Sequence, residues 1–575
     1  MCGIIGYTGT RRAERVLLDG LKTLEYRGYD SAGIALAGKE LTVFKCAGRV
    51  SALAAMVPSS DARAGIGHTR WATNGAPCAE NAHPHLSFDG SLAVVHNGVI
   101  ENCDEISRLL KREGVRMASG TDSEMIAHML ALEKGDIRER IFRVAEKLEG
   151  AMTILVLPRG GKRVYCFKRG AALLVAEGKR ECFAASDAAA LSPYVKEARA
   201  LKDGECAVLS PKGAEFFSRK GAAPPSPLIP VALSPALGHD CHMREEISEI
   251  PRALISTYRS FASRFPEREE VVARLKRSSR ILLTGCGTAY HACLYGERLT
   301  EELCGIPCRA LPAGEPCPSL FAGKDSFCVF VTQSGETADT LRAMEGCKRA
   351  GAYTLAVTNS PGSSAALQAD SALFLRAGRE VAVAATKTYC CQLLALWLLA
   401  HSAEGTGGEE EKVADLAKKC ETALRLPLPD VCDRSKLFFI GRGRDFVTAK
   451  EGALKYKEVT WLPADAYSAG ELKHGPIALA DADSTAIALL TDPAHAARIR
   501  AAVSELRSRG TKICAFTSAG DIGADETYIL PSSEECALSP VIAAIPLQRL
   551  ALECALRMER DPDKPRNLAK SVTVI

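Results

Sequence analysis

The sequence predicts an α+β domain with stacked sheets, followed by two α/β domains with parallel sheets. Three observations support this fold class. Short β-like runs separated by Gly, Asn and Asp fill residues 1–220, and a segment rich in Pro, Ala and Gly follows them. Beyond that segment, apolar strands alternate with long helical patterns. At 575 residues the chain is also too long for one hydrophobic core.

The first region contains the strand patterns of a compact domain. Six runs predict strands: "MCGIIGY", "AGIALA", "LTVFKCAG", "SLAVVHNG", "AMTILVL" and "RVYCFKRG". The apolar spacing of "SEMIAHMLALEK" predicts a helix between them. We place this domain at 1–220 and a linker, which includes "AAPPSPLIPVALSPALGHD", at 221–244.

An internal repeat organises the second region. "RILLTGCGTAYHA" and "KLFFIGRGRDFVTAKEGA" each combine an apolar strand, Gly-x-Gly and a helix, which predicts similar domains at 245–425 and 430–560 with a tail at 561–575. A dinucleotide site is disfavoured, because Tyr290 and Phe446 stand where that fingerprint needs a small residue. "YCCQLLALWLLA" is too short to span a bilayer and predicts a buried helix.

Composition excludes several classes of function. The net charge of +4 and the lack of a polybasic block argue against nucleic-acid binding. No signal-peptide pattern opens the chain, so we expect a cytoplasmic protein whose 22 cysteines are mostly reduced and buried. The pairs His83/His85 and Cys304/Cys308 lack a matching second pair, so no metal is expected.

Cys2 directly follows the initiating methionine. Removal of Met1 would give Cys2 a free α-amino group, whose usual pKa of about 7.7–8.0 suits a base near neutral pH. A thiol and its own base would then share one residue, as in N-terminal nucleophiles. The alternative is a buried cysteine that merely begins a strand.

Several residues of the first region fit amide chemistry, and each has a structural alternative. The Arg70 guanidinium suits bidentate capture of a carboxylate, or a surface ion pair. Asn97–Gly98 offers two donors for an oxyanion hole, or forms a type I′ hairpin turn. Asp122 suits an ammonium group, although Thr121 and Glu124 have the spacing of a helix capping box.

Five motifs together resemble the class II glutamine amidotransferase family: "YRGYDSAG", "GHTRWATNG", "NAHPH", "VVHNGVIEN" and "SGTDSEMIAH". The resemblance implies an N-terminal-nucleophile fold in which Cys2 attacks glutamine and Asn97 and Gly98 stabilise the tetrahedral intermediate. It further implies a gate for ammonia at Trp71. The glutamine-binding residues that it implies are Arg70, Trp71, Thr73, His83 and Asp122. The family usually has His where this chain has Asn74.

The stretch "CVFVTQSGETADTLRAM" is a strand, a hydroxyl-rich turn and a helix. Free N–H groups at the start of a helix bind anions, although simple Ser/Thr capping would explain the same residues. The stretch resembles the phosphosugar loop of sugar isomerase (SIS) domains. The sugar-phosphate-binding residues that this implies are Thr288, Thr332, Gln333, Ser334 and Thr337.

Three further segments carry candidate acid–base residues. "AKEGALKYKEV" places Glu451, Lys455 and Glu458 on one helix face, which is alternatively a solvated face with an ion pair. His474 precedes Gly-Pro, as turn histidines do. Lys570 lies near the end of the chain, but the apolar "SVTVI" that follows is unusual for a loose tail.

Two SIS domains behind a glutamine domain resemble the glucosamine-6-phosphate synthase family over essentially the whole chain. The resemblance implies that ammonia from glutamine passes to fructose 6-phosphate, whose amination and isomerisation give glucosamine 6-phosphate. It implies Glu458 as the base that moves a proton from C1 to C2, with Glu451 and Lys455 nearby. It implies that His474 opens the sugar ring from the partner subunit of a homodimer, and that Lys570 forms a Schiff base. No cofactor, nucleic acid or membrane is implied.

Two alternatives stay open. One is an amidotransferase acting on a different sugar phosphate, and the other is a phosphosugar-binding regulator without synthase activity. Three departures from the usual SIS pattern bear on the acceptor: Ala289 and Ala385 replace serines, and Thr332 replaces a serine before Gln-Ser-Gly-Glu-Thr.

Overall fold

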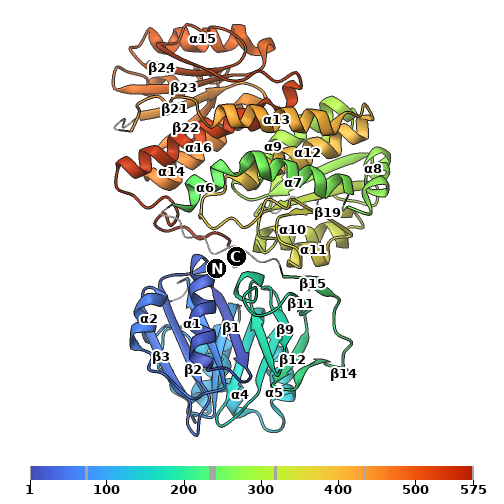
Figure 1. Ribbon diagram of the computed structural model, residues 1–575, viewed down its shortest axis with the longest axis vertical. Coiled ribbons are helices and arrows are strands. Elements are labelled where there is room, and N and C mark those ends of the chain that lie inside the picture. Colours follow the sequence, from blue (N-terminus) through green and yellow to red (C-terminus); the bar gives the residue numbers. More distant parts are fainter. Residues whose placement is uncertain are drawn as a thin grey trace. The chain divides into compact units, whose positions relative to one another are not determined.

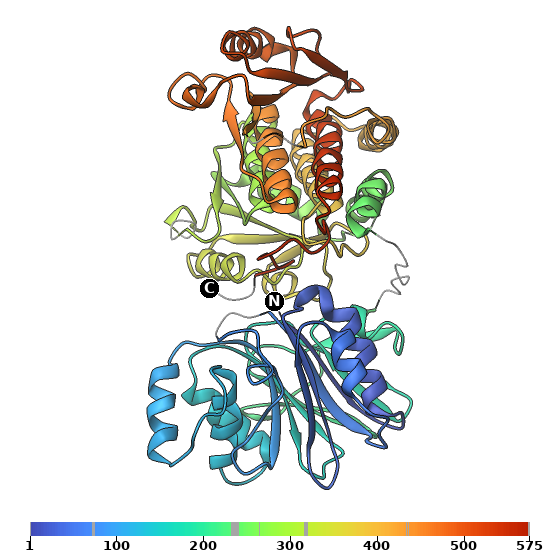
Figure 2. The same cartoon turned by 90° about the vertical axis from the view of Figure 1, so that its left-hand side faces the viewer.

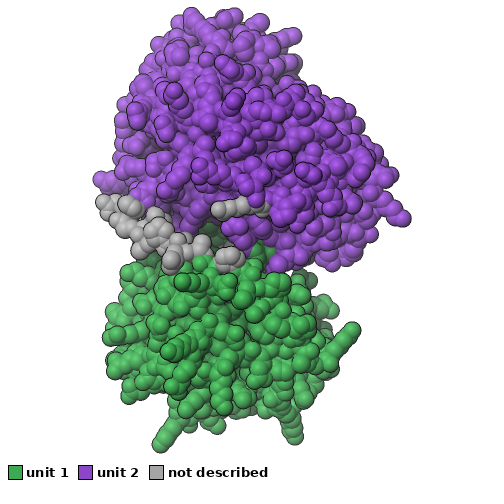
Figure 3. Space-filling model, turned by 45° about the vertical axis from the view of Figure 1, so that its right-hand side comes forward, with its two compact units in different colours: residues 1–236, 362–364, 569–575 green, residues 237–361, 365–568 purple. Residues whose placement is uncertain are grey.

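The computed structural model describes residues 2–71, 75–231, 241–263, 265–315, 320–432, 434 and 436–572. The chain forms two compact units, coloured separately in Figure 3. Unit 1 comprises Met1–Ala236, Gly362–Ser364 and Ala569–Ile575, and unit 2 comprises Leu237–Pro361 and Ala365–Leu568. The tail that begins at Ala569 is therefore grouped with unit 1.

Unit 1 contains two antiparallel sheets. Sheet A has the strand order β15-β11-β9-β10-β1-β4-β2-β3, and sheet B has the order β14-β13-β12-β8-β7-β6-β5. The strands are β1 Gly3–Thr8, β2 Ser31–Leu36, β3 Thr42–Ala47, β4 Ala64–Arg70, β5 His85–Leu86, β6 Leu92–Ile100, β7 Gly150–Pro158, β8 Val164–Lys168, β9 Leu174–Gly178, β10 Glu181–Ala185, β11 Glu197–Ala200, β12 Glu205–Ser210, β13 Gly213–Ser218, β14 Gly221–Ala222 and β15 Leu228–Pro230.

The two sheets stack between two layers of helices (Figure 1). Alternation along β1 shows why: Ile5 and Tyr7 pack under the helices on sheet A, whereas Ile4 packs toward sheet B. The helices of unit 1 are α1 Ala13–Leu24 and α2 Val50–Met56 on sheet A, and α3 Cys103–Arg112, α4 Ser123–Leu132 and α5 Ile137–Lys147 on sheet B. The predicted α+β fold with stacked sheets is confirmed.

The sequence patterns of this region match its elements closely. The six predicted strands correspond to β1, β2, β3, β6, β7 and β8, and the predicted helix is α4. β14 and β15 lie inside the segment expected to be a linker, because a Pro-rich composition is tolerated at the edges of a sheet. The other domain boundaries stay a prediction.

Unit 2 contains two parallel five-stranded sheets with the same strand order. Sheet C runs β17-β16-β18-β19-β20 and sheet D runs β22-β21-β23-β24-β25. The strands of sheet C are β16 Arg280–Gly285, β17 Cys308–Pro312, β18 Ser326–Thr332, β19 Tyr353–Thr358 and β20 Ser371–Phe374. Those of sheet D are β21 Lys436–Gly441, β22 Ala464–Ser468, β23 Ser484–Leu490, β24 Lys512–Thr517 and β25 Glu526–Ile529. The two predicted α/β folds with parallel sheets are confirmed.

Most helices of unit 2 meet in one shared core between the two sheets. These are α6 His242–Ser248, α7 Ile250–Ser263, α8 Arg268–Arg277, α9 Thr288–Cys304, α12 Lys387–Glu404, α13 Glu409–Ala423, α14 Arg444–Thr460 and α16 Ser539–Arg557. Two further helices, α10 Ala338–Arg349 and α11 Ser364–Gln368, pack in a separate core with sheet C, and α15 Ala496–Arg507 packs in a separate core with sheet D. Figure 2 shows α14, in orange, beside α16, in red, and α14 also packs against α9. α12 contains the apolar run predicted to be a buried helix, and it is buried along almost its whole length.

One described helix has the length and apolar composition of a membrane span. It covers Cys536–Arg557, and 83% of its most apolar window is buried inside the protein. A core helix passes the same test, so this is weak evidence for a membrane.

The two Gly-x-Gly turns have the same backbone conformation. Gly287 has φ 55° and ψ −125°, and Gly443 has φ 62° and ψ −128°. Residues with a side chain rarely adopt this region, which explains the glycine at both positions. The equal turns and equal strand orders confirm the internal repeat. In such a sheet, strands are added on one side of the first strand and then on its other side. Ligands bind at this switch point, at the carboxyl ends of the strands.

Candidate functional site

Cys2 lies just before β1, beside the end of β4. The backbone N–H of Trp71 donates to its Sγ at 3.3 Å, and the Asn97 side-chain amide donates to its carbonyl oxygen at 3.0 Å. Burial raises the pKa of the Cys2 thiol, and the Trp71 N–H counters this by stabilising a thiolate. The structure therefore brings Cys2, Trp71 and Asn97 together, and the thiol would need a nearby base to react at neutral pH.

Asn97 and Gly98 lie within β6, opposite Thr153 and Met152 of β7, so the alternative of a type I′ turn is wrong. Gly98 has φ 146°, and a Cβ there would come within 1.9 Å of the Ala151 carbonyl oxygen. Only glycine fits this position. The predicted pair is held rigidly by the sheet, as an oxyanion hole requires.

Arg70 is the last residue of β4, and its buried guanidinium donates to the carbonyl oxygens of Gly75 and Ala76 at 3.2 and 3.3 Å. These contacts hold Gly75 and Ala76 against the end of β4. The predicted glutamine ligand Thr73 and the departure at Asn74 lie outside the described residues. Capture of a carboxylate by Arg70 stays a prediction.

The motif "YRGYDSAG" packs against Arg70 and Trp71, a function that sequence reasoning did not assign to it. A Cβ on Gly28 would meet the Arg70 carbonyl carbon and the Trp71 nitrogen at 2.7 Å, so the two chain segments touch at a glycine. The Tyr29 and Trp71 rings lie 5.4 Å apart in an edge-to-face arrangement. The Arg27 guanidinium forms an ion pair with the Asp187 carboxylate at 2.5 Å, which holds the motif at the end of sheet A.

Asp122 anchors the end of the strand that carries Asn97 and Gly98. Its carboxylate accepts the Ile100 N–H at 2.9 Å. The capping box suggested by the spacing of Thr121 and Glu124 does not form, since α4 has no side-chain cap and the Glu124 carboxylate instead accepts the N–H of Ser119 at 2.7 Å. Binding of an ammonium group by Asp122 stays a prediction.

Four buried histidines lie behind Asn97. The His83 ring lies 4.0 Å from that of His68 and 4.7 Å from that of His85, and the His96 N–H donates to His83 at 3.5 Å. His68 Nε2 faces two acceptors, the His96 carbonyl at 3.1 Å and the Asn97 Oδ1 at 3.2 Å, so it carries the proton and orients the Asn97 amide. Sequence reasoning missed His68 and His96, although both lie inside recognised motifs.

Burial keeps these imidazoles neutral. It lowers the pKa of His68 and of His85 to about 3, and it lowers the pKa of His83 and His96 below the usual value. In the unfolded chain a histidine titrates near pH 6.5, so below that pH the unfolded state binds protons that the folded state excludes.

We therefore expect unit 1 to lose stability as the pH falls from about 6.5 to 4.5. The loss from His68 and His85 together should be about 4 kcal/mol at pH 5, since each costs about 1.4 kcal/mol per pH unit below 6.5. Hydrogen–deuterium exchange of β4 and β6 peptides in the full chain at pH 7, 6 and 5 would measure it. His85→Gln should flatten the dependence, and protection that is unchanged down to pH 5 would contradict the prediction.

The predicted sugar-phosphate loop lies at the carboxyl end of β18, beside β16, where the strand order predicts a ligand. Thr332 Oγ1 accepts the Gly335 N–H at 3.1 Å, and Ser334 Oγ accepts the Glu336 N–H at 3.1 Å. Thr337 is the N-cap residue of α10, yet its side chain makes no capping hydrogen bond. Ordinary capping therefore does not explain the threonine.

The face of α14 that carries Glu451, Lys455 and Glu458 packs against α9 and is not a solvated face. The side chains of Glu451 and Lys455 are 2% and 1% exposed. Lys455 Nζ lies 3.4 Å from Glu451 and 2.6 Å from Glu458. Burial lowers the pKa of Lys455, but the two carboxylates outweigh it and raise that pKa above its usual value.

Two residues of α9 complete this network. The Thr288 hydroxyl donates to Glu451 at 3.0 Å and accepts from Lys455 at 2.9 Å, which leaves one lone pair for another donor. His291 Nδ1 lies 2.7 Å from the other Glu451 oxygen. Sequence reasoning missed His291, and its position one turn after Thr288 was the available signal.

Two further predicted residues are His474 and Lys570. His474 is exposed in the turn after β22. Lys570 is half-buried and grouped with unit 1, whereas Glu458 belongs to unit 2. The roles of His474 and Lys570 stay predictions.

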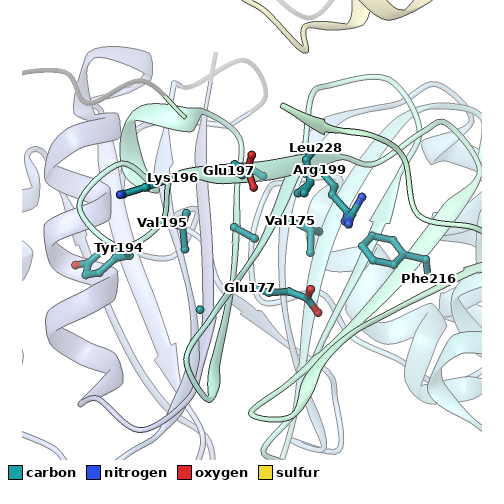
Figure 4. Close-up of a pocket in the computed structure, with 12 residues that line it drawn as sticks. Val175, Glu177, Tyr194, Val195, Lys196, Glu197, Arg199, Phe216 and Leu228 are labelled. Atoms are coloured by element: carbon teal, nitrogen blue, oxygen red, sulfur yellow. The ribbon is translucent and has the colours of Figure 1, made fainter. Parts of the chain in front are cut away.

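A pocket with a volume of about 320 Å³ opens in sheet A where β9 and β11 diverge (Figure 4). Only Arg199 and Ala200 of β11 pair with β9, so the strands separate beyond them. Two of its charged residues are engaged elsewhere, since Glu177 accepts the Ala214 N–H and Arg199 donates to the Ser226 carbonyl. None of the predicted site residues lines it.

Models of known protein families match both halves of the chain. The glutamine amidotransferase domain model matches residues 68–193. The SIS domain model matches twice, at residues 274–402 and 431–558. These matches correspond to unit 1 and to the two repeats of unit 2.

A solved structure with the same architecture covers the second half. The C-terminal domain of glucosamine-fructose-6-phosphate aminotransferase from Francisella tularensis aligns with a TM-score of 0.50 and 26% identity, over 57% of this chain and 99% of that one. The tagatose-6-phosphate ketose/aldose isomerase of Escherichia coli aligns with a TM-score of 0.51 at 22% identity, over 59% of this chain and 98% of that one, and shows the shared fold.

Curated relatives match over their full length. The proteins of Clostridium tetani, Symbiobacterium thermophilum and Aquifex aeolicus are 36%, 38% and 37% identical to this chain, and each alignment covers 100% of both sequences. All three are named glutamine–fructose-6-phosphate aminotransferase (isomerising). With its glutamine amidotransferase domain, its two SIS domains and this identity over the whole length, the chain belongs to the glutamine–fructose-6-phosphate aminotransferase (isomerising) family.

Proposed function

We propose that this chain transfers the amide nitrogen of glutamine to fructose 6-phosphate and isomerises the product to glucosamine 6-phosphate. One observation carries the proposal. A single chain, related to these enzymes from end to end, holds both Cys2, hydrogen-bonded to Asn97 of β6, and a buried Glu451–Lys455–Glu458 network. We further propose that it acts as a cytoplasmic homodimer.

In the first half-reaction, the Cys2 α-amino group takes the thiol proton after Met1 is removed. The thiolate attacks the side-chain carbonyl of glutamine, and Asn97 and Gly98 stabilise the oxyanion. Ammonia leaves with the proton returned by the amine, and water hydrolyses the γ-glutamyl thioester to glutamate. Arg70 and Asp122 hold the α-carboxylate and α-ammonium groups, and Trp71, Thr73 and His83 complete the glutamine site.

In the second half-reaction, His474 of the partner subunit opens the sugar ring, and Lys570 condenses with the C2 ketone and releases water. Ammonia displaces the lysine and leaves an imine at C2. Glu458 then moves a proton from C1 to C2 while the C1 hydroxyl proton passes to the imine nitrogen, so C1 becomes an aldehyde and C2 carries an amine. The phosphosugar is held by Thr288, Thr332, Gln333, Ser334 and Thr337.

Product analysis tests this function directly. The full chain, incubated with amide-¹⁵N glutamine and fructose 6-phosphate, should give glutamate and ¹⁵N-labelled glucosamine 6-phosphate by mass spectrometry. Glutamate with a different aminated sugar phosphate would show another acceptor. Phosphosugar binding without glutamate release would show a regulator.

The departures at Ala289 and Ala385 lead to a prediction about affinity. Thr332 replaces a serine at its own position, so its hydroxyl does not make up for those missing at Ala289 and Ala385. We expect Ala289→Ser with Ala385→Ser to lower the KM for fructose 6-phosphate by roughly threefold or more, because one restored hydrogen bond contributes about 0.5–3 kcal/mol. Steady-state kinetics would measure it, with Ala501→Ser on exposed α15 as the control. An unchanged KM would mean that the pocket is already satisfied.

A further inference from the structure

The network between α9 and α14 contains more negative than positive charges. Two carboxylates, Glu451 and Glu458, flank a single ammonium, Lys455. A buried carboxylate is stable only when it is paired and hydrogen-bonded. Lys455 is already 2.6 Å from Glu458, whereas its distance to Glu451 is 3.4 Å. Glu451 therefore depends on partners other than the lysine.

His291 is the closest of those partners. Its Nδ1 lies 2.7 Å from Glu451 Oε2, while Thr288 holds the other oxygen at 3.0 Å. An ionised carboxylate only accepts hydrogen bonds, so Nδ1 carries the proton in this contact. The ring is mostly buried, with 16% of the side chain exposed, and it is fixed on the first turns of α9.

We propose that His291 is a positioning residue for the proton transfer between C1 and C2: by holding Glu451, it keeps Lys455 against Glu458. This inference rests on the proposed function, in which Glu458 is the base. His291 itself does not touch the reacting carbons.

The geometry explains how the effect would reach Glu458. Glu451 and Glu458 compete for the same ammonium, that of Lys455. When His291 donates to Glu451, the need of that carboxylate for Lys455 is reduced, and the lysine stays close to Glu458. Without the imidazole donor, Glu451 draws Lys455 toward itself, and the Glu458 carboxylate loses both its orientation and the cation that sets its proton affinity.

Steady-state kinetics of His291→Ala in the full chain tests this. We expect kcat for glucosamine 6-phosphate to fall about tenfold to a hundredfold, the range for loss of a hydrogen bond to a charged group. The KM for fructose 6-phosphate should change less than about threefold, and basal glutamine hydrolysis should not change. The isotope effect on kcat with C1-deuterated fructose 6-phosphate should rise, since proton transfer becomes slower than the other steps.

His291→Asn keeps an N–H donor and should restore most of kcat, whereas Arg298→Ala, exposed on the same helix, should leave kcat unchanged. If calorimetry shows that His291→Ala is unfolded, His291→Phe, which keeps the ring volume but not the donor, takes its place with the same expectation. A parental kcat in the donor-free variant would overturn the inference. An equal loss in His291→Asn would also overturn it, because the imidazole itself would then be needed. Failure of the unmodified chain to make glucosamine 6-phosphate would instead refute the proposed function.

Discussion

Replacing Cys2 with alanine will abolish glutamine hydrolysis and glutamine-dependent synthesis, with a loss of at least about four orders of magnitude in rate. The reason is that the thiol is the only group proposed to attack the amide carbon, and removal of a covalent nucleophile leaves little residual catalysis. Glutamate release and ¹⁵N transfer from labelled glutamine would measure the loss.

Unit 2, which carries the predicted sugar-phosphate loop, should stay folded in this variant. Cys78→Ala, at a half-buried cysteine elsewhere in unit 1, is the matched control and should keep its activity. A variant that retains a residue ahead of Cys2 should be as inactive as Cys2→Ala, because an amide replaces the α-amino base, and mass spectrometry of active protein should show that Met1 is absent. Product formed by Cys2→Ala at the normal rate would rule out Cys2 as the nucleophile.

Glu458→Gln will stop hexosamine formation while leaving at least basal glutamine hydrolysis. Loss of a general base lowers rates by about 10²–10⁴. The amide also weakens the 2.6 Å contact with Lys455, so the buried ammonium keeps only Glu451 as a charged partner among the contacts described for it. Lys570→Ala should give the same separation of the two half-reactions, because no Schiff base can form.

Both activities should be measured on the same preparation. Glu421→Gln, exposed on α13, removes an equal charge and should behave like the unmodified chain. Glucosamine 6-phosphate made at the parental rate by either variant would show that the role given to that residue is wrong. Loss of glutamine hydrolysis as well would indicate misfolding or a coupling that these roles do not include.

Local patterns predicted most of the fold. The short apolar runs of β1 and β6 and the Gly-x-Gly turns after β16 and β21 depend on nearby residues only, so they can be read in sequence. The Asn97–Gly98 pair shows the limit. Asn-Gly commonly forms a hairpin turn, but here pairing with β7 holds it in a strand.

Family resemblance supplied the predicted site residues. The contacts between segments that are distant in the sequence could not be predicted. The face of α14 was recognisable from its spacing, but its burial depends on α9, more than 150 positions earlier in the chain. The clustered histidines behind Asn97 come from β4, β5, β6 and the segment leading into β5, and no spacing rule connects them. Tertiary packing, which no local pattern encodes, decides both features.

The shared turn geometry and strand order of the two repeats point to an ancestral duplication. The register that aligns Gly285 with Gly441 also aligns Tyr295 with Glu451 and Leu299 with Lys455. Had the ancestor been a symmetric pair of identical subunits, every charge buried at the contact of these helices would have appeared twice. In this chain one repeat has Tyr295 and Leu299 at these positions, and the other has Glu451 and Lys455. A fused chain can carry acid–base groups in one repeat without duplicating them in the other.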